Sequence, residues 1–174
     1  MRIQTARLEL IPATAALIRL EDSSPLALAT PLNAAIPAGW PPEEVRDVLG
    51  FFADQMDAGV TGDGWGIYYW VMLGDTAMPR TLVGSGGFMS KPNGGLVEVG
   101  YGTITEFQGQ GYATEAVSAL TAWALSQPEI SRVFAEALPD NVPSVRVLQK
   151  AGFAEAGPGA EEGTRRFEAP PSPQ

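Results

Sequence analysis

The segment that most constrains the fold of this chain is residues 98–116, EVGYGTITEFQGQGYATEA. It predicts an extended strand that passes through a glycine-containing turn directly into a helix. Gly109, Gly111 and Ala113 have little or no side chain, so the backbone of the turn is left accessible. The first N–H groups of such a helix have no intrahelical partner, and the helix dipole adds partial positive charge there. The segment therefore predicts a binding site for a phosphate or diphosphate group.

The chain has no cysteine and no histidine. Without cysteine there can be no disulfide, no thiol nucleophile and no thiolate-bound metal. Without histidine, serine–histidine catalysis is excluded. A carboxylate or a water molecule must therefore carry out any proton transfer.

The formal net charge is −9, from 11 basic and 20 acidic residues. An acidic surface repels nucleic-acid backbones, so we expect no nucleic-acid partner. The same charge favours a cationic substrate. Any anion at the glycine turn should then be held mainly by backbone amides.

A length of 174 residues with 45% apolar residues predicts one soluble domain over residues 1–167. Residues 168–174 contain three prolines and are expected to form a flexible tail. The longest apolar run, residues 67–73, has the length of a strand, so no membrane partner is expected. The first ten residues lack the pattern of a signal peptide, and a cytoplasmic location follows as the expectation. A monomer and a homodimer are both compatible with the sequence.

The hydrophobic periodicity predicts a mixed α/β fold with the order strand, helices, three strands, helix, strand, helix, strand. The three central strands have turn signals between them, which favours an antiparallel meander. The strands are expected at residues 7–11, 65–73, 81–89, 96–104, 132–138 and 153–167, and the helices at 14–20, 41–59, 113–124 and 141–151, with an irregular segment at 23–40.

Three pieces of the sequence occur in a specific order and spacing. Residues 98–101 read EVGY, residues 108–113 read QGQGYA and fit an Arg/Gln-x-x-Gly-x-Gly/Ala pattern, and residues 141–153 read NVPSVRVLQKAGF. Together they resemble the Gcn5-related N-acetyltransferase (GNAT) superfamily, above all its RimJ/RimL-like branch, which acetylates the N-termini of ribosomal proteins. The resemblance implies a mostly antiparallel central sheet with one splayed strand pair and helices on both faces.

The resemblance also implies that acetyl-CoA is the acetyl donor. Backbone N–H groups of residues 109–113 would bind the diphosphate, and the main chain of Tyr101 and Thr103 would bind the pantetheine arm. Asn141 would reach the same arm, although a helix N-cap is an equally suitable role for this residue. The implied cofactor-binding residues are Tyr101, Thr103, Gln108, Gly109, Gln110, Gly111, Tyr112, Ala113 and Asn141.

Two catalytic roles have to be assigned. Many members of the superfamily have a tyrosine seven residues after the asparagine, as the acid that protonates the leaving thiolate, but Leu148 stands here. Ser144 is the nearest hydroxyl that could act as this acid. Alternatively, a water molecule is the acid and the Ser144 hydroxyl only caps the helix. Glu98, Glu136 or water could accept the proton of the substrate ammonium. We favour Glu98, because the superfamily often has an acid there and partial burial would raise its pKa.

The resulting expectation is an acetyl-CoA-dependent N-acetyltransferase that acts on a primary amine, either a protein N-terminus or a small cationic amine, by direct attack on the thioester. The alternative is a catalytically silent acyl-CoA-binding regulatory protein. A nucleotide-dependent enzyme is disfavoured, since the sequence has neither a GxxxxGK[ST] loop nor a GxGxxG turn.

Overall fold

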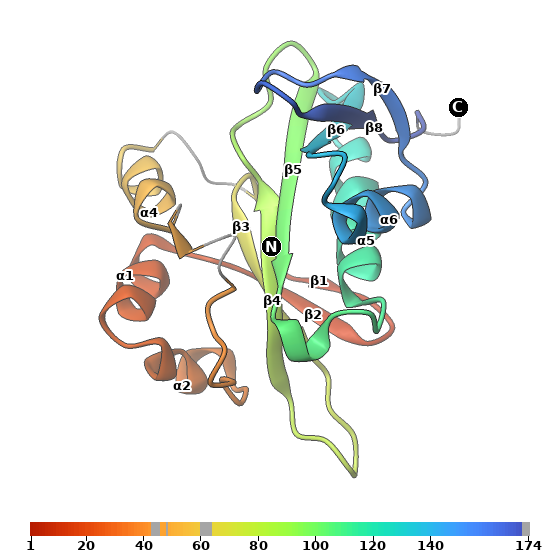
Figure 1. The fold of residues 1–174 in the computed structure, drawn as a ribbon. Coiled ribbons are helices and arrows are strands. Elements are labelled where there is room, and N and C mark those ends of the chain that lie inside the picture. The colour runs from red at the N-terminus through yellow and green to blue at the C-terminus, as the bar shows by residue number, and fades with distance from the viewer. Residues whose placement is uncertain (43–45, 48, 60–63, 172–174) are drawn as a thin grey trace.

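A computed structural model describes residues 1–42, 46–47, 49–59 and 64–171. Its centre is an eight-stranded sheet with the strand order β1-β2-β3-β4-β5-β6-β8-β7. Helices α1, α2 and α4 lie on one side of this sheet, and α5 and α6 lie on the other (Figure 1). The mixed, mostly antiparallel fold predicted from the sequence is confirmed.

The strands are β1 (Ile3–Gln4), β2 (Leu8–Pro12), β3 (Ile67–Met72), β4 (Thr81–Phe88), β5 (Leu96–Thr103), β6 (Arg132–Ala137), β7 (Ala154–Pro158) and β8 (Arg165–Glu168). The helices are α1 (Ala15–Ser23), α2 (Ala29–Leu32), α4 (Leu49–Asp57), α5 (Tyr112–Leu125) and α6 (Val142–Lys150), with short 3₁₀ turns η1 (Pro25–Leu28) and η2 (Thr105–Phe107).

The sheet opens between β5 and β6, the pair that runs parallel. Their register covers Leu96↔Arg132, Val97↔Val133 and Glu98↔Phe134, and β5 then continues to Thr103 without β6 beside it. On its other edge β5 stays paired with β4 as far as Thr103. The two strands therefore diverge beyond Glu98, as the splayed pair of the sequence analysis requires.

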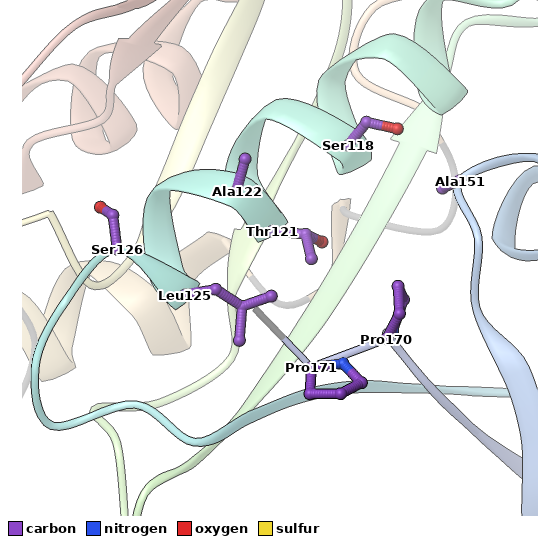
Figure 2. A pocket seen from close by; sticks show the side chains of 8 residues that line it. All are labelled: Ser118, Thr121, Ala122, Leu125, Ser126, Ala151, Pro170 and Pro171. Atoms are coloured by element: carbon purple, nitrogen blue, oxygen red, sulfur yellow. The ribbon is translucent and has the colours of Figure 1, made fainter. Parts of the chain in front are cut away.

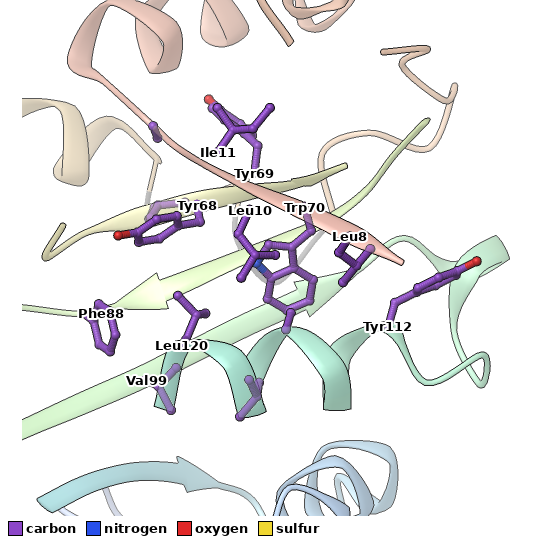
Figure 3. Packing of buried hydrophobic residues seen from close by; sticks show 14 of the residues in the cluster. Leu8, Leu10, Ile11, Tyr68, Tyr69, Trp70, Phe88, Val99, Tyr112 and Leu120 are labelled. Atoms are coloured by element: carbon purple, nitrogen blue, oxygen red, sulfur yellow. The ribbon is translucent and has the colours of Figure 1, made fainter. Parts of the chain in front are cut away.

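The main core lies between α5 and the centre of the sheet. Figure 3 shows Leu8, Leu10, Tyr68 and Trp70 pointing toward α5, whereas Ile11 and Tyr69 point to the opposite face. The glycines of β4 make room for Trp70, because a Cβ at Gly86 would lie 2.7 Å from its ring. The apolar repeat predicted for α5 faces the core: Ala113 is partly buried, and the buried members are Ala116, Val117, Leu120 and Ala124.

A buried carboxylate joins the elements of the opposite face. Glu21 of α1 is 2% exposed and accepts hydrogen bonds from Trp40 Nε1 (2.7 Å) and Tyr69 Oη (2.6 Å). Burial raises the pKa of Glu21, although these two hydrogen bonds act in the opposite direction. The contact ties α1 and the segment before residue 41 to β3, and so fixes the helical layer on that face.

We expect Glu21→Ala to lower the free energy of unfolding by about 3 kcal/mol, because two buried donors lose their acceptor. Denaturant unfolding of the purified protein measures this change. Asp22→Ala, at the exposed next position of α1, is the matched control and should change stability by less than about 0.5 kcal/mol. Equal effects of the two substitutions would show that the buried contacts of Glu21 do not stabilise the fold.

Three details differ from the sequence predictions. The two-residue strand β1 was missed, because so short a segment has no alternation to read. Residues 153–167 form the hairpin of β7 and β8 rather than one strand, and β8 lies between β6 and β7. Glu168 belongs to β8, and the N–H of buried Ala169 donates to the Val133 carbonyl (2.9 Å). The last strand thus ends one residue later than predicted.

The predicted helix at 41–59 is observed only in part. Among its described residues, Leu49–Asp57 form α4, which buries Leu49 and Phe52 as the periodicity requires. The expected first turn, residues 43–45, and Val48 lie outside the described residues.

Candidate active site

The turn before α5 leaves backbone donors free. Gly109 and Gly111 have φ of 74° and 86°, a left-handed conformation that favours glycine. Gly111 is the N-cap of α5 and no side chain caps the helix. The first backbone bond of the helix is donated by the Glu115 N–H to the Gly111 carbonyl (3.1 Å). Within the described residues, the amides from Gly111 to Thr114 have no acceptor, as an anion site requires.

The long side chains of this turn hold it to the protein. Gln108 Nε2 donates to the Thr103 carbonyl (3.0 Å) and Gln110 Nε2 donates to the Glu106 carbonyl (3.1 Å). Tyr112 is buried, and its hydroxyl donates to Met72 Sδ (3.1 Å). These residues can therefore offer backbone groups to a ligand, while their side chains maintain the turn.

Arg7, which directly precedes β2, also contacts the turn. Arg7 Nη1 donates to the Gln110 carbonyl (2.9 Å), and the guanidinium lies 4.6 Å from the centre of the Tyr112 ring. Arg7 Nε pairs with Glu115 Oε2 (2.7 Å). Partial burial acts to raise the pKa of Glu115, but hydrogen bonds from Thr5 and Arg7 lower it below its usual value. The sequence predicted an anion site formed mainly by backbone amides, and this nearby cation was not foreseen.

The free edge of β5 runs from the turn to a cavity. The Glu98 carbonyl accepts from Met89 N and Ile104 N donates to the Val83 carbonyl, so the backbone of even-numbered residues faces β4. Because successive residues of a strand alternate, the backbone of Tyr101 and Thr103 faces the opening. The Thr103 carbonyl is taken by Gln108, which leaves its N–H and both backbone groups of Tyr101 along the opening.

A cavity of about 270 Å³ lies at the Glu98 end of this edge. It brings together four of the predicted site residues: Glu98, Tyr101, Asn141 and Ser144. Thr103 and residues 108–113 are not part of its wall; they lie toward the other end of β5. The remaining lining residues are Phe52, Ile67, Gly86, Gly87, Met89, Val99, Gly100 and Glu136.

Residues 7–154 match a family model described as an acetyltransferase (GNAT) domain. The chain belongs to the GNAT acetyltransferase family.

Curated relatives of this GNAT chain agree with that assignment. It is 38% identical over 73 residues to the uncharacterized N-acetyltransferase YjdG of Bacillus subtilis, covering 41% of this chain and 44% of that protein. It is 33% identical over 60 residues to the uncharacterized N-acetyltransferase YnaD of the same species, covering 34% and 35%. The chain thus spans less than half the length of these two relatives.

Solved structures share the GNAT fold over nearly the whole chain. An acetyltransferase from Agrobacterium tumefaciens has a TM-score of 0.64 at 20% identity, covering 98% of this chain and 94% of the other. The ribosomal-protein α-N-acetyltransferase RimL has a TM-score of 0.63 at 19% identity, with coverages of 97% and 93%. A second RimL structure, in complex with coenzyme A, has a TM-score of 0.62 at 19% identity and covers 97% of each chain.

The two carboxylates of the GNAT cavity have different environments. Burial, together with the negative charges of Glu136 and Glu161, raises the pKa of Glu98. In the described part of the chain, no hydrogen bond or ion pair engages the Glu98 carboxylate. Glu98 is therefore available to accept a proton.

The Glu136 carboxylate already accepts hydrogen bonds from the protein. Its two oxygens accept from the Ala160 N–H (2.9 and 2.8 Å), and Oε2 also accepts from Thr164 Oγ1 (2.9 Å). Desolvation acts to raise the pKa of Glu136, but the hydrogen bonds lower it overall. Glu136 thus holds the loop between β7 and β8, and of the two candidate bases the geometry favours Glu98.

The start of α6 presents the second group of predicted residues. Asn141 is the N-cap, and its Oδ1 accepts from the Ser144 N–H (3.2 Å), so the capping role is observed. The Ser144 hydroxyl lies 3.0 Å from the Tyr101 hydroxyl. Leu148, at the position where the resemblance expects a tyrosine, is fully buried.

A second cavity, of about 340 Å³, lies between the outer side of α5 and the C-terminal segment (Figure 2). It is lined by Ser118, Thr121, Ala122, Leu125, Ser126, Ala151, Pro170 and Pro171. None of these side chains is ionisable and none was predicted to be functional, so acid–base chemistry is placed in the first cavity.

The described ranges contain no group of three carboxylate side chains arranged to hold a metal ion. Over the same ranges, no helix combines the length and the apolar character needed to cross a membrane.

Proposed function

We propose that this chain is an acetyl-CoA-dependent N-acetyltransferase that transfers an acetyl group to a primary amine by direct attack on the thioester. The observation that carries the proposal is the line formed by three features: the free amides at the start of α5, the open edge of β5 and the cavity at Glu98. From Thr103 to Glu98 this edge provides about 17 Å of extended backbone. An extended ligand anchored by a diphosphate at the turn would thus present its far end to the carboxylate.

The proposed roles follow the sequence analysis. Backbone N–H groups of residues 109–113 hold the diphosphate, and the free backbone of Tyr101 and Thr103 and the side chain of Asn141 hold the pantetheine arm. When bound, acetyl-CoA supplies the acetyl group as an activated thioester. Glu98 accepts the proton of the substrate ammonium directly or through water, and a backbone N–H polarises the acetyl carbonyl. Ser144 or a water molecule supplies a proton to the departing sulfur.

The acceptor is proposed to be a protein N-terminus or a small cationic amine. The carboxylates of Glu98 and Glu136 line the cavity, and the net charge of −9 disfavours an anionic acceptor. RimL, which shares the fold, is a ribosomal-protein α-N-acetyltransferase, and this favours the N-terminal amine. We further propose that one GNAT-like domain holds the entire site and acts as a monomer or homodimer.

A thiol-release assay tests the activity directly. Since the chain has no cysteine, a thiol reagent reports only the CoA that the reaction releases. The acceptor panel consists of octapeptides with a free N-terminal Ala, Ser or Met, together with lysine amide and spermidine. We expect acetyl-CoA to be consumed with at least one of these amines. Tight CoA binding without thiol release across the panel would instead identify the silent acyl-CoA-binding protein.

Arg7 provides a prediction about the diphosphate turn. We expect Arg7→Ala to raise the dissociation constant for CoA about tenfold, because the turn loses a hydrogen bond, a cation–π contact and a nearby positive charge. The rate at saturating acetyl-CoA should change by less than about twofold, since Arg7 is remote from the cavity. Calorimetric titration and initial rates measure the two effects.

Arg2→Ala is the matched control for Arg7→Ala. Arg2 lies in the same N-terminal hairpin and pairs with Glu9 (2.8 Å), so its removal deletes the same charge away from the turn. CoA affinity should survive this change. A comparable loss of affinity in both variants would mean that net charge matters and the local contacts of Arg7 do not.

A further inference from the structure

Two hydroxyl groups from distant parts of the chain meet in the cavity. Tyr101 Oη donates to the Ser144 carbonyl oxygen (3.0 Å) and also lies 3.0 Å from Ser144 Oγ, where either oxygen can be the donor. Tyr101 comes from β5 and Ser144 from the first turn of α6, and both line the cavity that contains Glu98. The proposed function uses only the main chain of Tyr101, so the phenol of this residue has no role in it.

Each hydroxyl has one proton, and the two equal distances allow the Tyr101 proton to be shared between the Ser144 carbonyl and Ser144 Oγ. If Tyr101 donated to the carbonyl alone, the Ser144 hydroxyl could donate to Tyr101 Oη, and its proton would be turned away from the cavity. When Tyr101 also donates to Ser144 Oγ, the Ser144 proton is kept for a third group such as a departing sulfur.

The surroundings keep Tyr101 a donor. Burial raises the pKa of Tyr101 to about 12, while its hydrogen bond with Ser144 acts in the opposite direction. The phenol therefore keeps its proton throughout the neutral range. The Ser144 backbone is fixed by the cap from Asn141, so the hydroxyl can reorient only about its own side-chain torsion.

We propose that Tyr101 is a positioning residue whose phenol donates to Ser144 Oγ and so directs the Ser144 proton toward the leaving sulfur. The proposal rests on the proposed function, and it accounts for Leu148: the hydroxyl absent from the second turn of α6 is replaced by that of Ser144, which Tyr101 of β5 positions. Tyr101 itself makes and breaks no covalent bond. The nitrogen–carbon bond forms as the carbon–sulfur bond breaks. Glu98 takes one proton of the substrate ammonium and water takes the second, while the sulfur takes the Ser144 proton, which water replaces.

A double-mutant cycle tests this assignment with acetyl-CoA and the fastest acceptor of the panel. We expect Tyr101→Phe to lower kcat about tenfold in the wild-type chain but by less than about twofold in a Ser144→Ala background. The KM for acetyl-CoA should be unchanged in Tyr101→Phe, because the main chain of β5 is retained. If Tyr101→Phe slows both backgrounds by the same factor, Tyr101 does not act through Ser144 and the proposal is overturned.

Tyr68→Phe is the matched control for loss of a buried phenol. Tyr68 Oη donates to the Gly64 carbonyl (2.9 Å) and burial likewise raises the pKa of Tyr68 to about 12, but Tyr68 does not line the cavity. Both phenylalanine variants should lose similar thermal stability, and only Tyr101→Phe should lose rate. Failure of the proposed function is distinguishable, since the wild-type chain would then release no thiol with any amine.

Discussion

Replacing Gly111 with aspartate is expected to weaken acetyl-CoA binding about 1000-fold, beyond the range of a normal calorimetric titration. Gly111 has a φ of 86° and lies at the N-cap of α5, where the amides of the first turn are free. An aspartate at an N-cap accepts hydrogen bonds from such amides. Its Cβ would also lie 3.3 Å from Arg7 Nη2, close enough for the carboxylate to pair with that guanidinium. The new side chain would thus occupy the diphosphate site itself.

Gly94→Asp separates this effect from charge and backbone strain. Gly94 precedes β5, has a φ of 57° and has open space where its Cβ would be, so it receives the same charge and a similar left-handed strain. Acetyl-CoA should bind Gly94→Asp with wild-type affinity. Wild-type affinity in Gly111→Asp as well would refute the cofactor site at the start of α5.

Replacing Glu98 with glutamine is expected to lower kcat about 100-fold while CoA binding stays intact. The carboxylate can accept a proton only when it is ionised, and its pKa is raised by burial and by the charges of Glu136 and Glu161. The wild-type rate should therefore fall as the pH drops through this raised pKa, at a higher pH than for an exposed glutamate. In Glu98→Gln this acid limb should be absent, and an unchanged pH–rate curve would exclude Glu98 as the base.

Glu98→Gln is expected to raise the stability of the fold, although it lowers the rate. Because the folded-state pKa of Glu98 is raised, its contribution to stability is complete at low pH and is lost as the pH rises through that pKa. At neutral pH the glutamine variant should therefore have a higher Tm than the wild type. Glu155→Gln, on exposed β7, is the control and should alter neither the rate nor the Tm.

The fold could be predicted where the sequence pattern is local. The strand, the turn and the helix around Gly111 were predicted because left-handed glycines and a 3.6-residue apolar repeat are visible in a single segment. The N-cap at Asn141 was predictable for the same reason. The β7–β8 hairpin was missed because a distant residue holds it in place. Glu136 accepts a hydrogen bond from the loop between the two strands, at Ala160, 24 residues further along the chain.

The candidate site was only partly predictable, because its polar contacts join distant segments. Arg7 meets the Gln110 carbonyl across 103 residues, and Tyr101 meets Ser144 across 43. No periodicity or spacing in one sequence indicates such pairs. Glu98 was favoured over Glu136 from the family resemblance, but the hydrogen bonds that already engage the Glu136 carboxylate are visible only in the folded structure.

Amide hydrogen exchange with and without saturating CoA tests the central claim most directly. The claim is that the free amides at the start of α5 and the open edge of β5 receive the ligand. We predict that CoA slows exchange in peptides covering residues 101–103 and 109–114, while exchange in α1 stays unchanged. Unaltered exchange in both segments at millimolar CoA would contradict the account.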